Sequence, residues 1–217
     1  MTDRPIIFSG EMVRTILEGR KTQTRRPVIR YGNSSVKRVL GPTKDGFFDF
    51  IFPEERGSSK DGIGHLVKCP FGQVGDRLWV RETWAMDSNC RHHFRATEPD
   101  YKPYTGAWNP SLYMSHWQSR ITLEITDIRI ERLQEITEED AKAEGARKFT
   151  NLPPDPSLYP YGNEPRWSME DPRSTRECLG SARYAFANLW ERLYAKKGLG
   201  WYANPWVWVI GFRRVKG

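Results

Sequence analysis

The chain is poor in cysteine and histidine, with three and four of them in 217 residues. An odd number of cysteines without regular spacing argues against a disulfide framework. No apolar run approaches the roughly 20 residues that a membrane-spanning helix needs. The first residues lack the basic segment, apolar stretch and small-residue cleavage site of a signal peptide. We therefore expect a cytoplasmic protein that does not insert into membranes.

Motifs of several common enzyme classes are missing as well. The sequence has no glycine-rich loop ending in Gly-Lys-Ser or Gly-Lys-Thr, and no Gly-x-Ser-x-Gly nucleophile motif. Zinc sites usually contain pairs of ligands at short spacing, and Cys90, His92 and His93 do not form such pairs with Cys69 or His116. We therefore predict neither a metal nor a cofactor. The sequence assigns no role to Cys90, His92 and His93.

Positive charge and aromatic side chains are abundant. Lysine and arginine number 34 against 27 acidic residues, which gives a net charge of +7, and aromatics make up 13% of the chain. Basic surfaces are typical of proteins with polyanionic partners, and exposed aromatic rings can stack on nucleic-acid bases. Alternatively, most of the aromatic rings form the core and the arginines lie on a solvated surface. Composition does not decide between these interpretations.

Three short helices are expected, each with an initiating polar residue or an apolar stripe and each followed by a glycine. The first spans 9–18, with Ser9 as its cap. The second spans 137–145, and its Thr137 and Asp140 form a capping box. The third has the apolar stripe Phe186, Leu189, Trp190 and Leu193.

Strand patterns outnumber the helix patterns. Alternating apolar and polar residues predict a long strand over 120–133, and shorter strands are expected at 20–26, 46–52, 63–68, 78–84 and 206–212. Strands and helices do not alternate regularly, so we predict an α+β fold built on a small β-barrel with short helices. Residues 1–217 are expected to form a single domain with three insertions, at about 28–68, 86–118 and 146–178.

A basic turn at residues 19–26, Gly-Arg-Lys-Thr-Gln-Thr-Arg-Arg, is the candidate site. A threonine hydroxyl is a poor nucleophile until a base takes its proton, and Lys21 could do so if it faces Thr24. Lys21 would have to be neutral, and its pKa should be lowered by partial burial and by the positive charges of Arg20, Arg25 and Arg26. Alternatively, this turn binds phosphate or is simply solvated.

The same turn carries a resemblance to a known family. Gly19-Arg20-Lys21-Thr22-x-Thr24-x-Arg26 resembles the Gly-x-Lys signature of ASCH domains, which have a PUA-like fold. The match is closest to the small bacterial ASCH amidohydrolases that cleave N(4)-acetylcytidine, and it covers the elements outside the three insertions. Larger ASCH proteins with the motifs found here at 79–84 and 204–209 are familiar from phages and prophages.

The resemblance implies the roles of three residues. Lys21 corresponds to the base, Thr24 to the nucleophile, and Glu144 to the carboxylate that orients the amine or moves protons to the leaving group. The chain is then expected to be a metal-independent amidohydrolase acting on N-acylated cytidine or a related modified pyrimidine nucleoside. An ionised Glu144 would raise the pKa of Lys21, so a shared proton between the two is plausible. Glu138 and Glu139 are neighbouring candidates for the same carboxylate.

Four further residues are expected to bind the substrate: Arg20, Arg26, Glu82 and Trp84. For Glu82 a salt bridge on a strand is the competing interpretation. Two other functions stay open, a non-catalytic module that binds RNA or other nucleic acid, and a ribonuclease that uses the same lysine and an acidic residue. The expected partner is accordingly a modified nucleoside or RNA, and the oligomeric state is not predicted.

Overall fold

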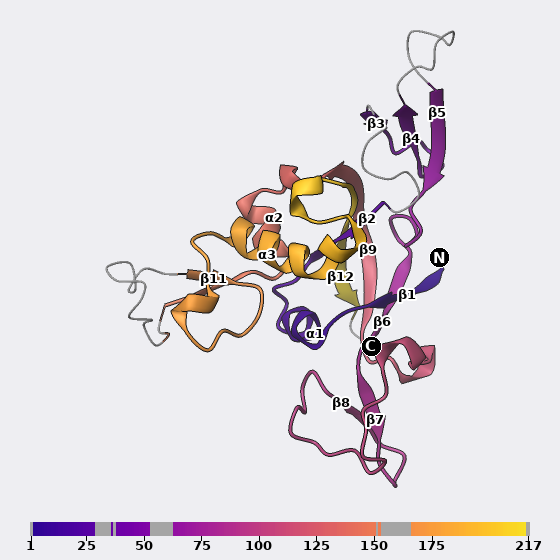
Figure 1. Ribbon diagram of the computed structural model, residues 1–217. Coiled ribbons are helices and arrows are strands. Elements are labelled where there is room, and N and C mark those ends of the chain that lie inside the picture. Colours follow the sequence, from indigo (N-terminus) through magenta and orange to yellow (C-terminus); the bar gives the residue numbers. More distant parts are fainter. Residues whose placement is uncertain are drawn as a thin grey trace.

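A five-stranded sheet forms the centre of the computed structural model, which describes residues 2–28, 36, 38–52, 63–150, 152 and 166–215 (Figure 1). Its strand order is β1-β6-β9-β12-β2. The bounds are β1 (Asp3–Ile7), β6 (Arg77–Arg81), β9 (Thr122–Arg132), β12 (Trp206–Val215) and β2 (Gln23–Pro27). β1 runs parallel to β6, and the other neighbours are antiparallel. The predicted α+β class, with mostly strands and a few short helices, is confirmed.

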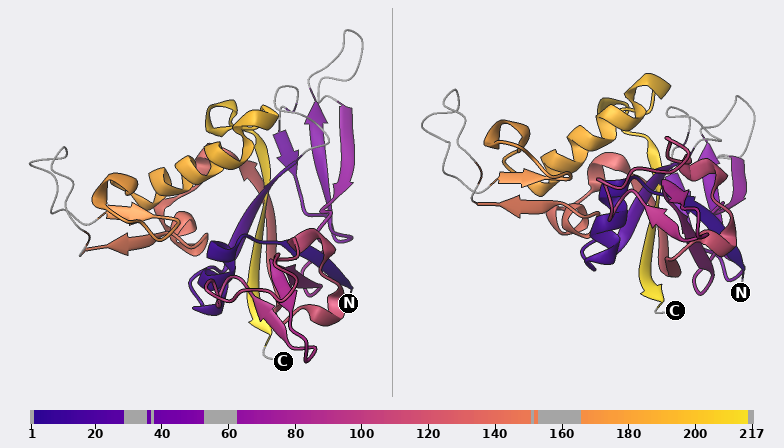
Figure 2. Two further views of the ribbon diagram at one scale, coloured as in Figure 1. Left: turned by 60° about the horizontal axis from the view of Figure 1, so that its bottom comes forward. Right: turned by 90° about the horizontal axis from the view of Figure 1, so that it is seen from below.

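Three small sheets project from this centre in different directions (Figures 1 and 2). They are β3–β5 (Arg38–Leu40, Phe47–Phe52 and Ile63–Lys68), β7–β8 (Trp84–Met86 and His92–Phe94) and β10–β11 (Arg147–Phe149 and Arg166–Ser168). β3–β5 and β10–β11 lie within the segments 28–68 and 146–178, and β7–β8 overlaps the segment 86–118. That these segments are insertions stays a prediction. Parts of the first and third of these segments lie outside the described residues.

Three α-helices accompany the sheet: α1 (Gly10–Leu17), α2 (Glu138–Ala143) and α3 (Ala182–Tyr194). Single 3-10 turns are found at Ser111–Tyr113, His116–Gln118, Leu133–Glu135, Thr175–Glu177, Ala195–Lys197 and Trp201–Ala203. None of the helices in the described residues has both the length and the apolar character needed to cross a membrane. Two helix caps are as predicted, because Ser9 Oγ accepts from the Met12 N–H and Thr137 Oγ1 from the Asp140 N–H.

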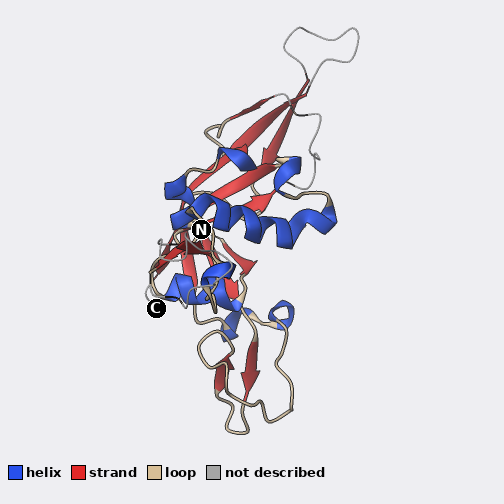
Figure 3. Ribbon diagram, turned by 60° about the vertical axis from the view of Figure 1, so that its left-hand side comes forward, coloured by secondary structure: helices blue, strands red, loops and turns tan. Residues whose placement is uncertain are grey.

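The two faces of the central sheet belong to different apolar clusters. On β12, Trp208 and Ile210 point to the side that is packed with residues of β6, β9 and α1. Val207 and Val209 point to the opposite side, where α3 crosses the sheet (Figure 3) and buries Phe186, Leu189 and Trp190. The predicted stripe of α3 is wrong at Leu193, which is 47% exposed, whereas the next residue, Tyr194, packs against this cluster.

A closed β-barrel is not found among the described strands, since β1 and β2 are the two edges of an open sheet. A side chain connects these edges instead of a backbone ladder. Arg26 Nη2 donates a hydrogen bond to the carbonyl oxygen of Ile7 at 2.6 Å, and its guanidinium lies 5.2 Å from the centre of the Phe8 ring.

The cap of α2 gives a test of local stability. Replacing Thr137 by alanine should lower the free energy of unfolding by about 1 kcal/mol, because the Asp140 N–H loses its acceptor. Urea denaturation followed by circular dichroism measures this change. Thr137→Ser keeps the hydroxyl and should stay close to the wild type. Equal stability of the alanine variant and the wild type would show that the cap does not hold α2.

Candidate active site

The centre of the candidate site is a buried ion pair between Lys21 and Glu144. Lys21 lies in the turn between α1 and β2, and Glu144 is the C-terminal cap of α2. The Lys21 Nζ lies 2.7 Å from Glu144 Oε2 and donates a second hydrogen bond to the Glu144 carbonyl oxygen at 2.8 Å. The lysine side chain is 0% exposed and the glutamate side chain 3%.

Backbone hydrogen bonds fix the approach of these two segments. The Lys21 N–H donates to the carbonyl of Thr15 in α1, and the Thr22 N–H donates to Ala143 at the end of α2. The chain then reverses at Gly145, whose φ of +110° strongly favours glycine. A Cβ at Gly145 would also lie 3.1 Å from Thr15 Oγ1. The turn that carries Lys21 is therefore bonded to α1 on one side and to the end of α2 on the other.

Burial lowers the pKa of the Lys21 ammonium group below its ordinary value of 10.5. The carboxylate of Glu144 acts in the opposite direction, and Arg26 and Arg25 lower the pKa further. The predicted direction is thus correct, but burial is the larger cause. Arg20 contributes little, because its guanidinium points to Glu18 and to the carbonyl of Gly145.

Arg25 holds the second oxygen of the Glu144 carboxylate, a role that the sequence did not reveal. Its side chain is 0% exposed, and its Nη1 lies 3.3 Å from Glu144 Oε1. The same guanidinium contacts Asp140 Oδ2 at 3.0 Å and donates from Nε to Glu131 Oε1 at 3.1 Å. These carboxylates also bind Arg129, at 2.8 Å and 3.1 Å. Both oxygens of Glu144 are therefore fixed.

The buried and part-buried groups of this network balance when Lys21 is protonated, with Lys21, Arg25 and Arg129 opposite Glu144, Glu131 and Asp140; the more exposed Asp127 adds a fourth carboxylate at Arg129. At the Asp140 carboxyl, burial and the neighbouring charges also shift the pKa in opposite directions. Burial raises its pKa, but Arg25, the hydrogen bond from Gln23 and Arg129 outweigh burial and hold the pKa below the usual value. Loss of the Lys21 proton would leave one negative charge in excess within this cluster.

Thr24 lies close to this cluster but on the other face of β2. It pairs with Ile210 and Arg25 pairs with Val209, and consecutive residues of a strand point to opposite faces. Thr24 is only 3% exposed, and within the described part of the chain its hydroxyl makes no hydrogen bond. Together with Glu144 it lines a small pocket of about 30 Å3, which has room for roughly two water molecules. Lys21 and Glu144 are thus in direct contact, while Thr24 is a neighbour without a bond to either.

Arg20 and Arg26 lie on either side of the pair. The Arg20 Nη1 donates to the carbonyl oxygen of Gly145 at 2.9 Å, directly after Glu144 in the chain. Arg26 is directed to Ile7 and Phe8, and like Thr24 it lines the small pocket. Both guanidinium groups are partly exposed. Their expected role in substrate binding stays a prediction.

Glu82 and Trp84 belong to a different part of the structure, where β6 leads into β7. Arg120 binds the Glu82 carboxylate through two bonds, at 2.9 Å and 3.0 Å, and its guanidinium lies 4.0 Å from the centre of the Phe94 ring. Glu82 thus makes the strand salt bridge named above as its competing interpretation. Within the described residues, no hydrogen bond or ion pair joins Glu82 or Trp84 to Lys21.

The histidine-rich segment forms its own contacts. His93 Nδ1 lies 2.6 Å from Glu98 Oε2, and the ring stacks on Tyr101 at 3.7 Å between centroids. His92 packs edge-on against Trp117, and Cys90 is exposed with a φ of +62°. Across the described ranges, no group of three or more histidine, cysteine, aspartate or glutamate side chains is placed to hold a metal ion.

Comparison with known proteins gives two structural similarities. No protein-family model and no curated protein match the chain. An ASCH domain from Lactobacillus crispatus JV V101 aligns with 98% of this chain and 79% of its own, at 12% identity and a TM-score of 0.40. Protein EF3133 from Enterococcus faecalis V583, described as a DUF984 protein, aligns over 99% and 81%, at 11% identity and a TM-score of 0.40. Neither alignment assigns an activity or a site residue to this chain.

The lowered pKa of Lys21 predicts a dependence of stability on pH. The unfolded chain binds more protons at this lysine between the folded pKa and 10.5, so stability should rise with pH across that window. The free energy of unfolding of the wild type relative to Lys21→Met should therefore increase from neutral pH to about pH 10. Urea unfolding at several pH values measures the difference. The matched control is Lys142→Met, which removes a half-exposed lysine and should give a flat difference. A flat difference for Lys21→Met would contradict the lowered pKa.

Proposed function

We propose that this chain is a metal-independent amidohydrolase that acts on N-acylated cytidine or a related modified pyrimidine nucleoside. The observation that supports this proposal most directly is the buried Lys21–Glu144 pair at 2.7 Å. Burial favours a neutral amine at Lys21, and a neutral amine is what a general base requires. The adjoining pocket lies beside Glu144.

The chemistry would proceed in two stages. Lys21 Nζ takes the proton of the Thr24 hydroxyl, and the oxygen attacks the acyl carbon to form an ester on Thr24. The Lys21 ammonium then gives its proton to the leaving amine of the cytosine ring, and Glu144 stabilises the ammonium in between. In the second stage Lys21 takes a proton from water, the hydroxide cleaves the ester, and the proton returns to Thr24. In the structure Thr24 makes no hydrogen bond to Lys21 and faces the other side of β2 from Arg25, so the scheme requires the hydroxyl and the amine to approach each other when substrate binds.

Arg25 supports the same chemistry through Glu144. Because Arg25 Nη1 occupies Oε1, the other carboxylate oxygen is directed at Lys21. Arg20 and Arg26 flank the pair and are proposed to contact the substrate, as are Glu82 and Trp84 if the substrate extends to the β7–β8 sheet. Contact with Glu82 and Trp84 requires a substrate larger than a nucleoside.

Hydrolysis of N(4)-acetylcytidine tests this function. Lys21→Ala, Glu144→Gln and Thr24→Ala should each lower kcat/KM by about 10²- to 10⁴-fold, the range that general acid–base groups contribute. Thr24→Ser should keep part of the activity, because it keeps the hydroxyl. Chromatography that separates cytidine from substrate gives the rate. Lys142→Ala and Glu139→Gln are controls that change an exposed charge of the same type near α2.

The proposal fails if the wild type releases no cytidine from a panel of N-acylated nucleosides. It also fails if Lys21→Ala and the wild type react at the same rate.

Binding of RNA without catalysis is the second candidate, and exposed aromatic rings favour it. Tyr104, Tyr113 and Trp117, all in the segment 86–118, are 82%, 71% and 73% exposed, in a protein of net charge +7. Rings exposed to this degree can stack on unpaired bases, and a positive protein attracts the phosphate backbone.

Titration of labelled single-stranded RNA at several salt concentrations tests this candidate. Affinity should fall steeply with salt, because bound phosphates release counterions, and Trp117→Ala should weaken binding by about tenfold through lost stacking. Tyr202→Ala removes an equally exposed ring elsewhere and should have no effect. An affinity that does not change with salt excludes this candidate, and cleavage of the labelled RNA would point to a ribonuclease.

A further inference from the structure

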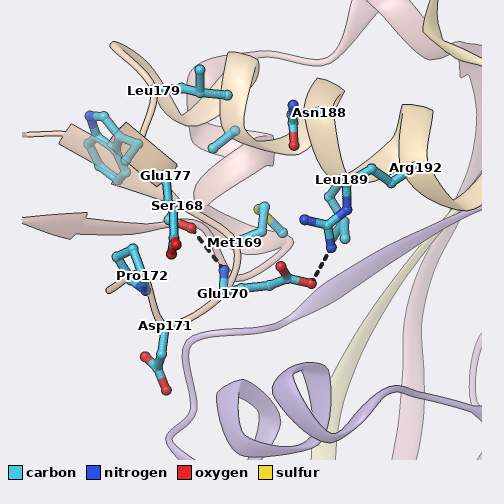
Figure 4. A pocket seen from close by; sticks show the side chains of 12 residues that line it. Ser168, Met169, Glu170, Asp171, Pro172, Glu177, Leu179, Asn188, Leu189 and Arg192 are labelled. Carbon is cyan, nitrogen blue, oxygen red and sulfur yellow. Dashed lines mark hydrogen bonds and ion pairs between the residues drawn. The ribbon is translucent and has the colours of Figure 1, made fainter. Parts of the chain in front are cut away.

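A second and larger pocket lies between β11 and α3. Its volume is about 230 Å3. One wall is the segment 167–172, and the other is the face of α3 that carries Asn188 and Arg192 (Figure 4). The segment belongs to the insertion at 146–178, for which the resemblance offers no counterpart. None of the proposed catalytic residues lines this pocket.

Met169 is shared between this pocket and the small one that Thr24 and Glu144 line. Met169 and Leu189 line both pockets. Met169 is only 9% exposed, and Figure 4 shows its side chain lying against Leu189. Methionine is unbranched and adapts its shape readily. A ligand in the larger pocket would therefore touch a movable side chain, with the unpartnered Thr24 and the Glu144 carboxylate in the pocket on its other side.

The lining of the larger pocket is acidic, although the protein as a whole is basic. Glu170, Asp171 and Glu177 line it together with Arg192, and Arg192 is already paired with Glu170 at 2.6 Å. The exposed amide of Asn188 makes no hydrogen bond within the described residues, and it offers both a donor and an acceptor. Trp167 adds a flat apolar surface. Such a lining suits an uncharged group with several hydroxyls and repels a phosphate.

We propose that this pocket binds the ribose of an uncharged nucleoside, with the base directed past Met169 toward Glu144. The inference rests on the proposed function: it proposes where the substrate of that reaction binds and restricts it to nucleosides without a phosphate. Carboxylates are common acceptors for ribose hydroxyls, as in dinucleotide-binding folds. A 5′-phosphate would add negative charge beside Glu170 and Glu177, and juxtaposed like charges are costly. The pocket therefore selects nucleosides over nucleotides and over RNA.

Calorimetric titration of the whole protein with cytidine and with cytidine 5′-monophosphate tests the selection. Cytidine should bind at least about tenfold more tightly than the monophosphate, because of the repulsion described above. Glu177→Gln removes one charge at nearly constant size and should reduce this ratio severalfold. Glu139→Gln is the matched control, since Glu139 is 81% exposed on α2 and lines neither pocket. It should leave the ratio unchanged.

Methyl NMR locates the bound nucleoside. The methyl signal of Met169, assigned with Met169→Leu in protein labelled at methionine methyl groups, should shift when cytidine is added. Cytidine that does not bind, a ratio near one, a ratio unaffected by Glu177→Gln, or an unshifted Met169 signal would each overturn the inference. Hydrolysis is measured separately. If no acylated nucleoside is cleaved but cytidine binds in this pattern, the pocket stands and the proposed activity fails.

Discussion

A lysine with no exposed surface needs a carboxylate, and the structure around Lys21 is organised to supply one. The Nζ lies 2.7 Å from Glu144, and Arg25 fixes the other oxygen of that carboxylate. Removing one partner from a buried ion pair costs about 3–5 kcal/mol in proteins where it has been measured. The turn after α1, the end of α2 and the strand β2 therefore have to stay together. The same restraint keeps a potential base and a potential proton carrier in contact.

The two core clusters meet at this point. One face of β2 continues the packing around Trp208 and Ile210, and Thr24 belongs to it. The other face carries Arg25 and the carboxylates beneath α2 and α3. A polar network within an otherwise apolar interface is tolerated because its groups find partners, and such networks define a single arrangement of the elements. The candidate site is thus also what orients the helices on the sheet.

Local signals made much of the fold predictable. The capping box of Thr137 and Asp140 and the alternation over 120–133 depend on neighbours in sequence, and both agree with the structure. Closure of a barrel depends on strands far apart in sequence, and it is not confirmed, because β1 and β2 are the two edges of the sheet among the described strands.

In the candidate site, too, the residues marked by a local sequence motif could be predicted, and those placed by distant strands could not. A family motif suggested Lys21 and Glu144 together, and the structure has them in contact. The role of Arg25 follows only from the register of β2 on β12 and of β12 on β9, which places it beside Glu131. Alternation along β2 could have signalled that Thr24 and Arg25 face opposite sides, but not which side carries the carboxylates.

The strand order determines when during synthesis the parts of this site can come together. β2, near the start of the sequence, has β12 as its neighbour in the sheet, and β12 spans Trp206–Val215. Lys21 and Glu144 are both present once residue 144 has been synthesised. The strand that carries Arg25 can pair with its neighbour β12 only after residues 206–215 have left the ribosome. A nascent or truncated chain would thus carry a lysine and a glutamate without the strand that aligns them. The alignment of these side chains by the sheet is therefore complete only once β12 has formed.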